Sequence, residues 1–359
     1  MLTLIVFLFV LSVLIIAHEF GHFIIARKMG VRVEKFSLGF GPRVWVKKGK
    51  ETEYTISAIP LGGYVKMAGD NLEEYKGKPD EYFSKSPKAR AAIVFFGPLL
   101  NYILGFLCFW VVFFAGYPTP TSKVGSVIDG SGAKEAGIQV GDKVVAIDGK
   151  SIAYFEELQE IVRNKKPLEV VKLSILRGNK EQTVNVTIKE QQLNDILGQK
   201  RRVGLLGIGV DYSDFVKVRH GFFKSFILSA QKTYDITTLT LKSLLRMITG
   251  KLSMRESVTG PLGIYMITAK VAAQGLVALL NFIGLLSVSL GIFNLLPLPI
   301  LDGGHILLLG IEKIRGRSLS LKTDQIITRI GFAIIISLVL VVTYNDLLKF
   351  GNKLIPWLK

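Results

Sequence analysis

The chain has 359 residues, of which 49% are hydrophobic and 20% are charged, and its formal net charge is +17. Its single cysteine, Cys108, cannot form a disulfide within the chain, so cysteine usage says nothing about the redox compartment. A charge of this size raises the question of nucleic acid. We find no recognition helix, zinc finger or aromatic-basic RNA motif, and this excludes nucleic acid from the expected partners.

Nearly pure apolar stretches alternate with polar ones along the chain. This pattern is typical of a multi-pass membrane protein with a water-exposed insert, rather than of a soluble enzyme. A stretch of about 20 apolar residues is long enough to cross a bilayer as a helix. The sequence predicts about four transmembrane helices, within residues 1–27, 91–116, 276–300 and 326–348.

The polar loop 28–90, between the first two predicted spans, contains β-prone pieces. The pieces "RVWVKK" and "TEYTIS" flank the turn residues "GKE", which predicts a β-hairpin. A further piece, "PLGGYVKMAG" (60–69), contains glycines that allow close approach of another backbone.

A small α+β domain is predicted over residues 121–190, where short β runs surround one helical pattern, "YFEELQEIVRN". Residues 191–219 are expected to be a linker with one more short β piece. Residues 220–250 combine helical apolar spacing with interleaved lysines, which favours an amphipathic interfacial helix over a fifth span.

The distribution of basic residues predicts the orientation in the membrane. The loop 28–90 and the shorter loop within 301–325 are both rich in Lys and Arg, which places them in the cytoplasm. The segment 121–275 is also basic, but long segments translocate largely regardless of charge. We therefore expect both termini and the 121–190 domain on the extracytoplasmic side.

The first predicted span carries the motif "HEFGH". An ionisable side chain near the bilayer centre costs about 3 kcal/mol on insertion scales, so His18, Glu19 and His22 need a function that offsets this cost. Residues four apart lie on one face of a helix, so both histidines can bind one metal ion. Glu19 occupies the position of the general base in hydrolases with an H-E-x-x-H motif.

A catalytic zinc site uses three protein ligands and one open position, so two histidines leave the site one ligand short. The stretch "NLLPLPILDGGH" (294–305) ends the third predicted span and offers two candidates. Asp302 follows two prolines that break the helix, and His305 lies three residues further on. Spacing alone does not choose between them. The two glycines between them allow close packing against the first helix.

Five motifs occur in one order along the chain, namely "HEFGH", "GPLLN", "VGSVIDGSGAKEAGIQVGDKVVAIDG", "GPLGI" and "NLLPLPILDGGH". In these motifs the chain resembles the bacterial site-2 proteases of the RseP type, which are intramembrane zinc metalloproteases. The resemblance implies that His18, His22 and Asp302 bind one Zn²⁺ per chain and that Glu19 is the general base. It also implies that the 121–190 region is a PDZ domain.

The resemblance further assigns residues that hold an extended substrate. Asn294, Pro297 and Pro299 would position the substrate strand. The β elements of the loop 28–90 would be associated with the membrane, and the element containing Gly62, Gly63 and Tyr64 would pair with the substrate. The expected substrates are single-pass transmembrane segments of anti-sigma-factor-like regulators or remnant signal peptides, cleaved in the bacterial cell membrane during regulated intramembrane proteolysis.

The sequence departs from the best-known enterobacterial pattern in having one PDZ domain instead of two. This domain could capture substrate C-termini or act only as a gate, and the sequence favours neither. Gly97 is interpreted as a packing residue, whereas Asn101 either packs the second span against the other spans or forms a hydrogen bond near the site. Two rival functions are weaker: a PDZ scaffold would be expected to lack a ligand or the base, and a metal transporter would need a polar path across the bilayer.

Overall fold

The computed structural model describes residues 2–194, 198–316 and 320–354. The chain divides into two compact units. The helical unit contains Met1–Phe114, Gly221–Leu244 and Ser253–Lys359, and the β unit contains Ala115–His220 and Leu245–Leu252.

Among the described residues of the helical unit, four helices are long and apolar enough to cross a membrane. They are α1 (Leu2–Lys28), α2 (Pro87–Ala115), α8 (Leu276–Asn294) and the Gln325–Phe350 part of α10 (Leu321–Leu354). The third predicted span ran from 276 to 300, whereas α8 ends at Asn294. Pro297 and Pro299 explain the shorter helix, because proline supplies no backbone N–H and clashes with the preceding turn.

Glycines bring α1, α2 and α8 into close contact. A Cβ atom added to Gly21 of α1 would lie 2.1 Å from the backbone oxygen of Phe96 in α2. A Cβ atom on Gly105 of α2 would lie 2.8 Å from the oxygen of Gly284 in α8. Such contacts require small residues and are a common way to pack membrane helices. The contact at Gly21 places the "HEFGH" motif of α1 directly against α2.

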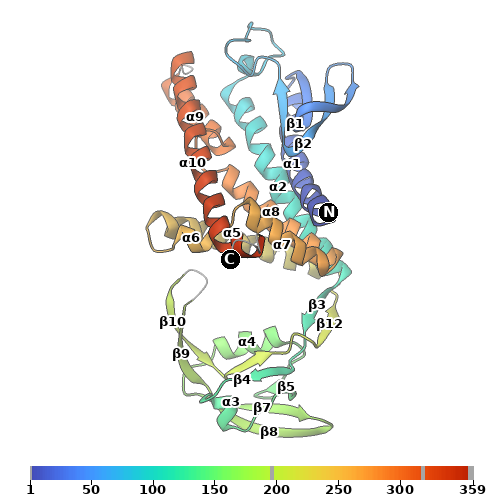
Figure 1. The fold of residues 1–359 in the computed structure, drawn as a ribbon, viewed down its shortest axis with the longest axis vertical. Helices are drawn as coiled ribbons and strands as arrows, with labels where there is room; N and C mark the ends of the chain where they lie inside the picture. The colour runs from blue at the N-terminus through green and yellow to red at the C-terminus, as the bar shows by residue number, and fades with distance from the viewer. Residues whose placement is uncertain (1, 195–197, 317–319, 355–359) are drawn as a thin grey trace. The chain divides into compact units, whose positions relative to one another are not determined.

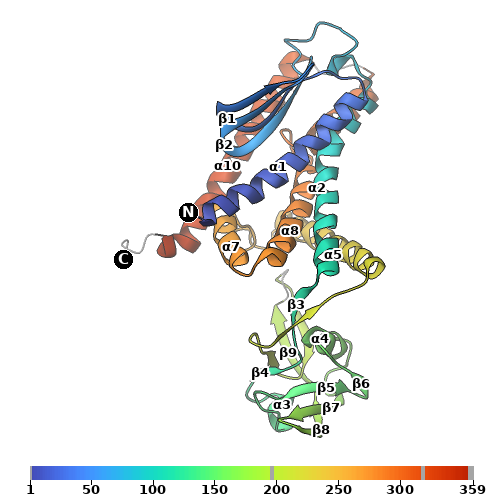
Figure 2. The ribbon, with the colours of Figure 1, turned by 90° about the vertical axis from the view of Figure 1, so that its right-hand side faces the viewer.

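Strands β1 (Val33–Lys48) and β2 (Glu53–Met67) form an antiparallel sheet beside α1 (Figures 1 and 2). The predicted hairpin is present, with Lys48 opposite Glu53. Each strand is longer than predicted and folds back, so residues 33–38 of β1 pair with both 53–56 and 63–67 of β2. Residues 63–67 therefore form one edge of the sheet. The buried side chains between the sheet and α1 include Phe23, Ala26 and Val33.

The remaining helices complete the helical unit. They are α5 (Phe222–Ile248), which continues into the β unit, α6 (Met254–Ser257), α7 (Pro261–Ala273) and α9 (Asp302–Arg315). The buried Asp346 of α10 accepts hydrogen bonds from the backbone N–H groups of Gly260 and Gly263, at the start of α7. The sequence did not predict α7, which is too short to span a bilayer. The motif "GPLGI" thus begins a helix.

The β unit is built around a four-stranded antiparallel sheet in the order β6-β5-β7-β8. Its core contains buried side chains such as Val144, Leu173 and Val186, covered by Leu158 and Val162 of α4. The remaining strands form three two-stranded pairs. The helices and strands of this unit are β3 (Tyr117–Pro120), β4 (Val124–Val127), α3 (Gly132–Glu135), β5 (Lys143–Ile147), β6 (Lys150–Ser151), α4 (Phe155–Arg163), β7 (Val170–Arg177), β8 (Lys180–Thr187), β9 (Lys189–Asn194), β10 (Lys200–Leu205), β11 (Ile208–Val210) and β12 (Phe215–Val218). The short helix η1 (Tyr82–Ser84) belongs to the helical unit.

The structure corrects the expectation for residues 191–219. Instead of a linker, this segment contains β10, β11, β12 and most of β9. Strand β11 pairs with β4, and β12 pairs with β3, so the segment completes the β unit. Strands β9 and β10 pair with each other, and their polar sequences lack the apolar alternation that would have revealed them.

Candidate metal centre

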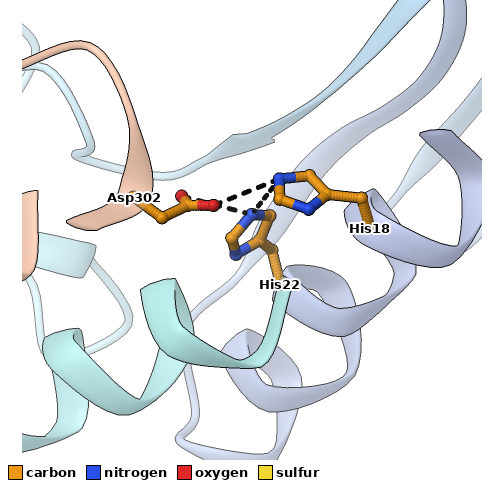
Figure 3. Close-up of side chains that lie close together, drawn as sticks. All are labelled: His18, His22 and Asp302. Atoms are coloured by element: carbon orange, nitrogen blue, oxygen red, sulfur yellow. Dashed lines mark hydrogen bonds and ion pairs between the residues drawn. The ribbon is translucent and has the colours of Figure 1, made fainter. Parts of the chain in front are cut away.

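Three side chains from two distant parts of the chain converge in the helical unit. His18 and His22 come from α1, and Asp302 is the first residue of α9. One ligand atom from each residue lies within 4.8 Å of the others. The Nε2 atoms of the two histidines are 3.2 Å apart, and the Asp302 carboxylate lies 3.2 Å from His18 and 3.5 Å from His22. Figure 3 shows the two rings and the carboxylate pointing toward one another.

This arrangement fits a metal ion. Ligand atoms at about 2.0–2.1 Å from a tetrahedral zinc ion lie roughly 3.3–3.4 Å from one another. The three separations in the structure are close to this value. Two imidazole nitrogens and one carboxylate are also a donor set that zinc accepts, with a fourth position open. The spacing in the sequence left Asp302 and His305 as alternatives, and the structure brings Asp302 to the histidines.

The turn before α9 is closely packed and depends on glycine. A Cβ atom on Gly303 would lie 2.2 Å from the oxygen of Leu295, and one on Gly304 would lie 2.0 Å from the oxygen of Leu298. Any side chain at these positions would push α9 away from the loop 295–301. The sequence "LDGG" therefore starts α9 with Asp302 held at one fixed place.

The backbone of α2 lies against the two histidine rings at Gly97. A Cβ atom on Gly97 would lie 2.3 Å from Nε2 of His22 and 3.0 Å from Cε1 of His18. The interpretation of Gly97 as a packing residue was correct as far as the α1–α2 contact, but it missed that the packed groups are the two histidines. Only a glycine leaves room for both rings.

The outer ring nitrogens of both histidines have partners. His22 Nδ1 lies 2.9 Å from the backbone oxygen of Ile93, which fixes the ring plane. His18 Nδ1 lies 3.5 Å from the amide nitrogen of Asn101 and 3.4 Å from that of Asn294. Ile93 contributes through its backbone, so its residue type gave no signal in the sequence.

A cavity of about 270 Å³ opens beside His22 and Asp302. Glu19, His22, Asp302 and His305 all line it. Glu19 follows His18 directly in α1, and Val65 of β2 lines the same cavity. The polar lining provides a place for water next to the candidate metal centre.

The wall of the cavity away from the histidines contains further polar groups. Arg90 of α2 forms a buried ion pair with Glu312 of α9. The Asp70 carboxyl and the Tyr82 hydroxyl also line the cavity, and burial raises the pKa of both. The Arg90–Glu312 pair could not be predicted from the sequence, because 222 residues separate the two and nothing local marks them as partners.

The residues expected to position a substrate have different surroundings. Gly63 lies at the start of the sheet edge 63–67, where a Cβ atom would be 3.2 Å from Cγ of Glu19. Gly62 has a φ of +136°, a conformation that other residues rarely adopt. The Tyr64 ring stacks on Phe40, on the sheet.

The two prolines lie in the loop before α9. Pro297 is exposed, and Pro299 packs close to Gly331 of α10, where an added Cβ atom would be 2.8 Å from the Cβ of Pro299. Of the six residues expected to position a substrate, Asn294 contacts His18 directly and Gly63 lies beside Glu19.

Comparisons with known proteins identify the family of the chain. The family model described as "Peptidase family M50" matches residues 6–338. The chain is 29% identical to the "Zinc metalloprotease RasP" of Oceanobacillus iheyensis, over 97% of this chain and 99% of that protein. It is 30% identical to the "Regulator of sigma E protease" of Haemophilus influenzae, over 96% of this chain and 98% of that protein.

The match to the family model extends from α1 to α10 and contains His18, Glu19, His22 and Asp302. The relatives are matched over nearly their whole length, and the helical unit has four helices suited to a bilayer. The chain is therefore a bacterial membrane protein and a metalloprotease, and it belongs to peptidase family M50.

Proposed function

We propose that this chain is an intramembrane zinc endopeptidase that cleaves transmembrane segments of other proteins. One observation carries the proposal: the ligand atoms of His18, His22 and Asp302 converge among helices suited to a bilayer, with Glu19 lining the same cavity. Ionisable groups in such helices are costly, and this cost is expected where they perform a function.

His18, His22 and Asp302 would hold one Zn²⁺ per chain. Zinc is supported by the donor set, by the separations between the ligand atoms and by the names of the relatives. When bound, zinc polarises the scissile carbonyl and makes water more acidic. His305 lines the cavity without belonging to the three-residue cluster, so we leave it out of the ligand set.

Glu19 would act as the general base. Its carboxylate lines the cavity together with His22 and Asp302, within reach of water in that space. In the proposed mechanism Glu19 takes a proton from the attacking water and then passes it to the leaving amine.

The sheet edge 63–67 would hold the substrate in an extended form. A transmembrane helix shields its peptide bonds in backbone hydrogen bonds, so a protease must unwind it and replace those bonds. Adding the substrate as a strand beside β2 supplies the replacement. Gly62, Gly63 and Tyr64 belong to this part of β2, and Asn294, Pro297 and Pro299 would position the opposite side of the substrate.

The expected substrates are single-pass segments of anti-sigma-factor-like regulators or remnant signal peptides in the bacterial cell membrane. The name of the Haemophilus relative, a regulator of sigma E, favours the first class. The β unit would be the PDZ domain, on the extracytoplasmic side. It would either bind substrate C-termini or act as a gate.

The test compares the purified wild type in detergent with Glu19→Gln. Zinc content is measured per chain, together with cleavage of a tagged single-span substrate. We expect about one zinc ion in both proteins, as for a single three-ligand site, and cleavage only by the wild type. Removal of zinc with a chelator is expected to abolish cleavage, and added zinc to restore it.

The matched control is Glu51→Gln, a change of the same type at an exposed position in the β1–β2 turn. This variant is expected to cleave like the wild type. Cleavage by Glu19→Gln at the wild-type rate would contradict the proposed base. Failure of the wild type to cleave any member of a panel of single-span substrates would contradict the endopeptidase itself.

A further inference from the structure

Asn101 is a fully buried polar residue next to the candidate metal centre. It lies on α2, one helical turn after Gly97, and its exposed fraction is 0%. Its amide nitrogen lies 3.5 Å from Nδ1 of His18. Its side-chain oxygen has no hydrogen-bond partner within the described part of the chain. A buried polar atom without a partner is costly and calls for an explanation.

The state of His18 in a metal site gives that explanation. Its Nε2 atom faces His22 and Asp302, so Nε2 is the atom available to a metal ion. A neutral imidazole bound to metal through Nε2 carries its proton on Nδ1 and must donate it to an acceptor. Both side chains near Nδ1, Asn101 and Asn294, present an amide nitrogen, which is also a donor.

One of the two amides must therefore present its oxygen to His18. The oxygen and nitrogen of an amide are assigned from the hydrogen-bond network, so a turn of 180° is permitted. In Asn101 the turn breaks no hydrogen bond to another residue among those described, because its oxygen has no partner and its nitrogen contacts only His18. His22 provides the parallel, since its Nδ1 lies 2.9 Å from the backbone oxygen of Ile93.

Asn294 is less suited to this task. It is only partly buried, and it ends α8 immediately before the loop with Pro297 and Pro299. Its amide can be reached by another molecule, whereas that of Asn101 is enclosed by helices. The backbone of Asn101 is fixed as well, because its carbonyl accepts a hydrogen bond from Ser287 of α8 at 2.6 Å.

We propose that Asn101 is a positioning residue whose side-chain oxygen accepts the Nδ1–H of His18. It fixes the tautomer and the ring orientation of His18 for metal binding, and it leaves Asn294 free to contact substrate. The inference rests on the proposed metal site, but not on the identity of the substrate or on cleavage. Outer partners of metal-binding histidines change metal affinity by about 10–100-fold when they are removed.

The experiment measures the dissociation constant of zinc for the full-length protein in detergent, by competition with a chelator. Asn101→Leu removes the acceptor at similar volume, and Asn101→Asp keeps an oxygen in its place. We expect Asn101→Leu to bind zinc about 10–100-fold more weakly, and Asn101→Asp to bind it like the wild type. Absorption of the cobalt-substituted protein gives a second readout, which should change only in the leucine variant.

Two controls separate this role from general damage to the fold. Asn345→Leu removes another buried asparagine whose oxygen has no partner among the described residues, on α10, and it should leave zinc affinity unchanged. Asn294→Leu should also keep wild-type zinc affinity. If Asn101→Leu does not fold, Asn101→Ala takes its place, with affinity below that of Asn101→Asp.

Wild-type zinc affinity in Asn101→Leu would overturn the proposal, as would a loss in Asn101→Asp equal to that in Asn101→Leu. A loss of affinity in Asn294→Leu alone would transfer the role to Asn294 and overturn it too. If zinc affinities follow expectation but the wild type cleaves no substrate, the proposed endopeptidase fails and the role of Asn101 stands. If the wild type binds no zinc, both proposals fail.

Discussion

Single residues at the candidate metal centre show what a sequence motif can predict. The motif "HEFGH" places His18 and His22 on one face of a helix, because the helical repeat brings residues four apart together. This motif therefore predicted two of the three converging side chains, and the stretch 294–305 offered Asp302 and His305 as alternatives for the third. The surroundings of Gly97 and Asn101 could not be predicted in this way. They depend on how far α2 lies from α1, and no local pattern records that distance.

Gly97 gives the first prediction at this scale. Gly97→Ala places a methyl group where 2.3 Å separates it from His22, so the ring must move. We expect zinc affinity to fall by about 10–100-fold, as when other supports of metal-binding histidines are lost. Gly310→Ala on α9 is the matched control, because a Cβ atom there would meet nothing within 4 Å. Equal zinc affinities in the two variants would contradict the prediction.

Asp142 of the β unit gives a prediction about pH. Its buried carboxylate accepts hydrogen bonds from Arg177 at 2.7 and 2.8 Å and from the N–H of Gln139 at 2.8 Å. The guanidinium of Arg177 is the main cause that lowers the pKa of this carboxyl below its usual range. The folded state therefore favours the charged form. The charged carboxylate therefore adds to the free energy of unfolding at pH values above the ordinary aspartate pKa. This added stability is lost as the pH falls through the lowered pKa of Asp142.

Asp142→Asn is expected to lower the free energy of unfolding at neutral pH by about 1–2 kcal/mol, since Arg177 is partly exposed and solvent weakens the pair. The difference from wild type should shrink as the solution is acidified. Calorimetry of the full chain between neutral and acidic pH measures this. Asp129→Asn, at a highly exposed carboxylate, should follow the wild type throughout. A constant difference across the pH range would refute the assignment.

At the scale of elements, the sequence predicted apolar helices better than it predicted strands. The four long apolar helices follow from composition and length, whereas the end of α8 depends on two prolines. Strands β9 and β10 were missed because they pair only with each other and carry polar residues such as Gln191 and Gln192. The double pairing of β1 was missed too, since periodicity predicts a strand but not how many neighbours it has.

The ion pair of Arg90 and Glu312 joins α2 to α9. Glu312 lies on the same helix as Asp302, ten residues further along the chain. Removing one partner of a buried pair leaves the other charge buried, so Arg90→Met should lower the free energy of unfolding by about 3–5 kcal/mol. The double change Arg90→Met with Glu312→Leu should recover most of this loss. Thermal unfolding of the zinc-free protein measures both effects without interference from metal binding.

An exposed ion pair provides the comparison. Lys66 and Glu74 lie 3.0 Å apart at the surface, so Glu74→Gln should change the free energy of unfolding by less than about 1 kcal/mol. If Arg90→Met lowers the free energy of unfolding no more than Glu74→Gln does, the buried pair does not hold α9 in place.

At the scale of the whole molecule, charge predicts orientation. The net charge of +17 is carried in part by the loop between α1 and α2, which the positive-inside rule assigns to the cytoplasm. The β unit is then expected on the opposite side. Since Cys108 is the only cysteine of the chain and is buried, Cys108→Ser gives a background for single-cysteine labelling.

Val140→Cys in the β unit and Lys50→Cys in the β1–β2 turn test this orientation, as both positions are exposed. In intact spheroplasts an impermeant maleimide should label Val140→Cys and not Lys50→Cys. After the membrane is opened, both should react. The reverse pattern would invert the predicted topology. Labelling of both in intact spheroplasts would place the β1–β2 turn on the extracytoplasmic side and contradict the prediction.

The three converging side chains also have a consequence for biosynthesis. His18 and His22 leave the ribosome near the start of translation, whereas Asp302 follows after most of the chain has been made. Until α9 folds against α1, the nascent chain has two of the three groups and an incomplete cavity. If these groups are the ligands, the newborn protein cannot hydrolyse neighbouring nascent membrane proteins at the translocon. Its proteolytic competence begins only when its own synthesis is almost finished.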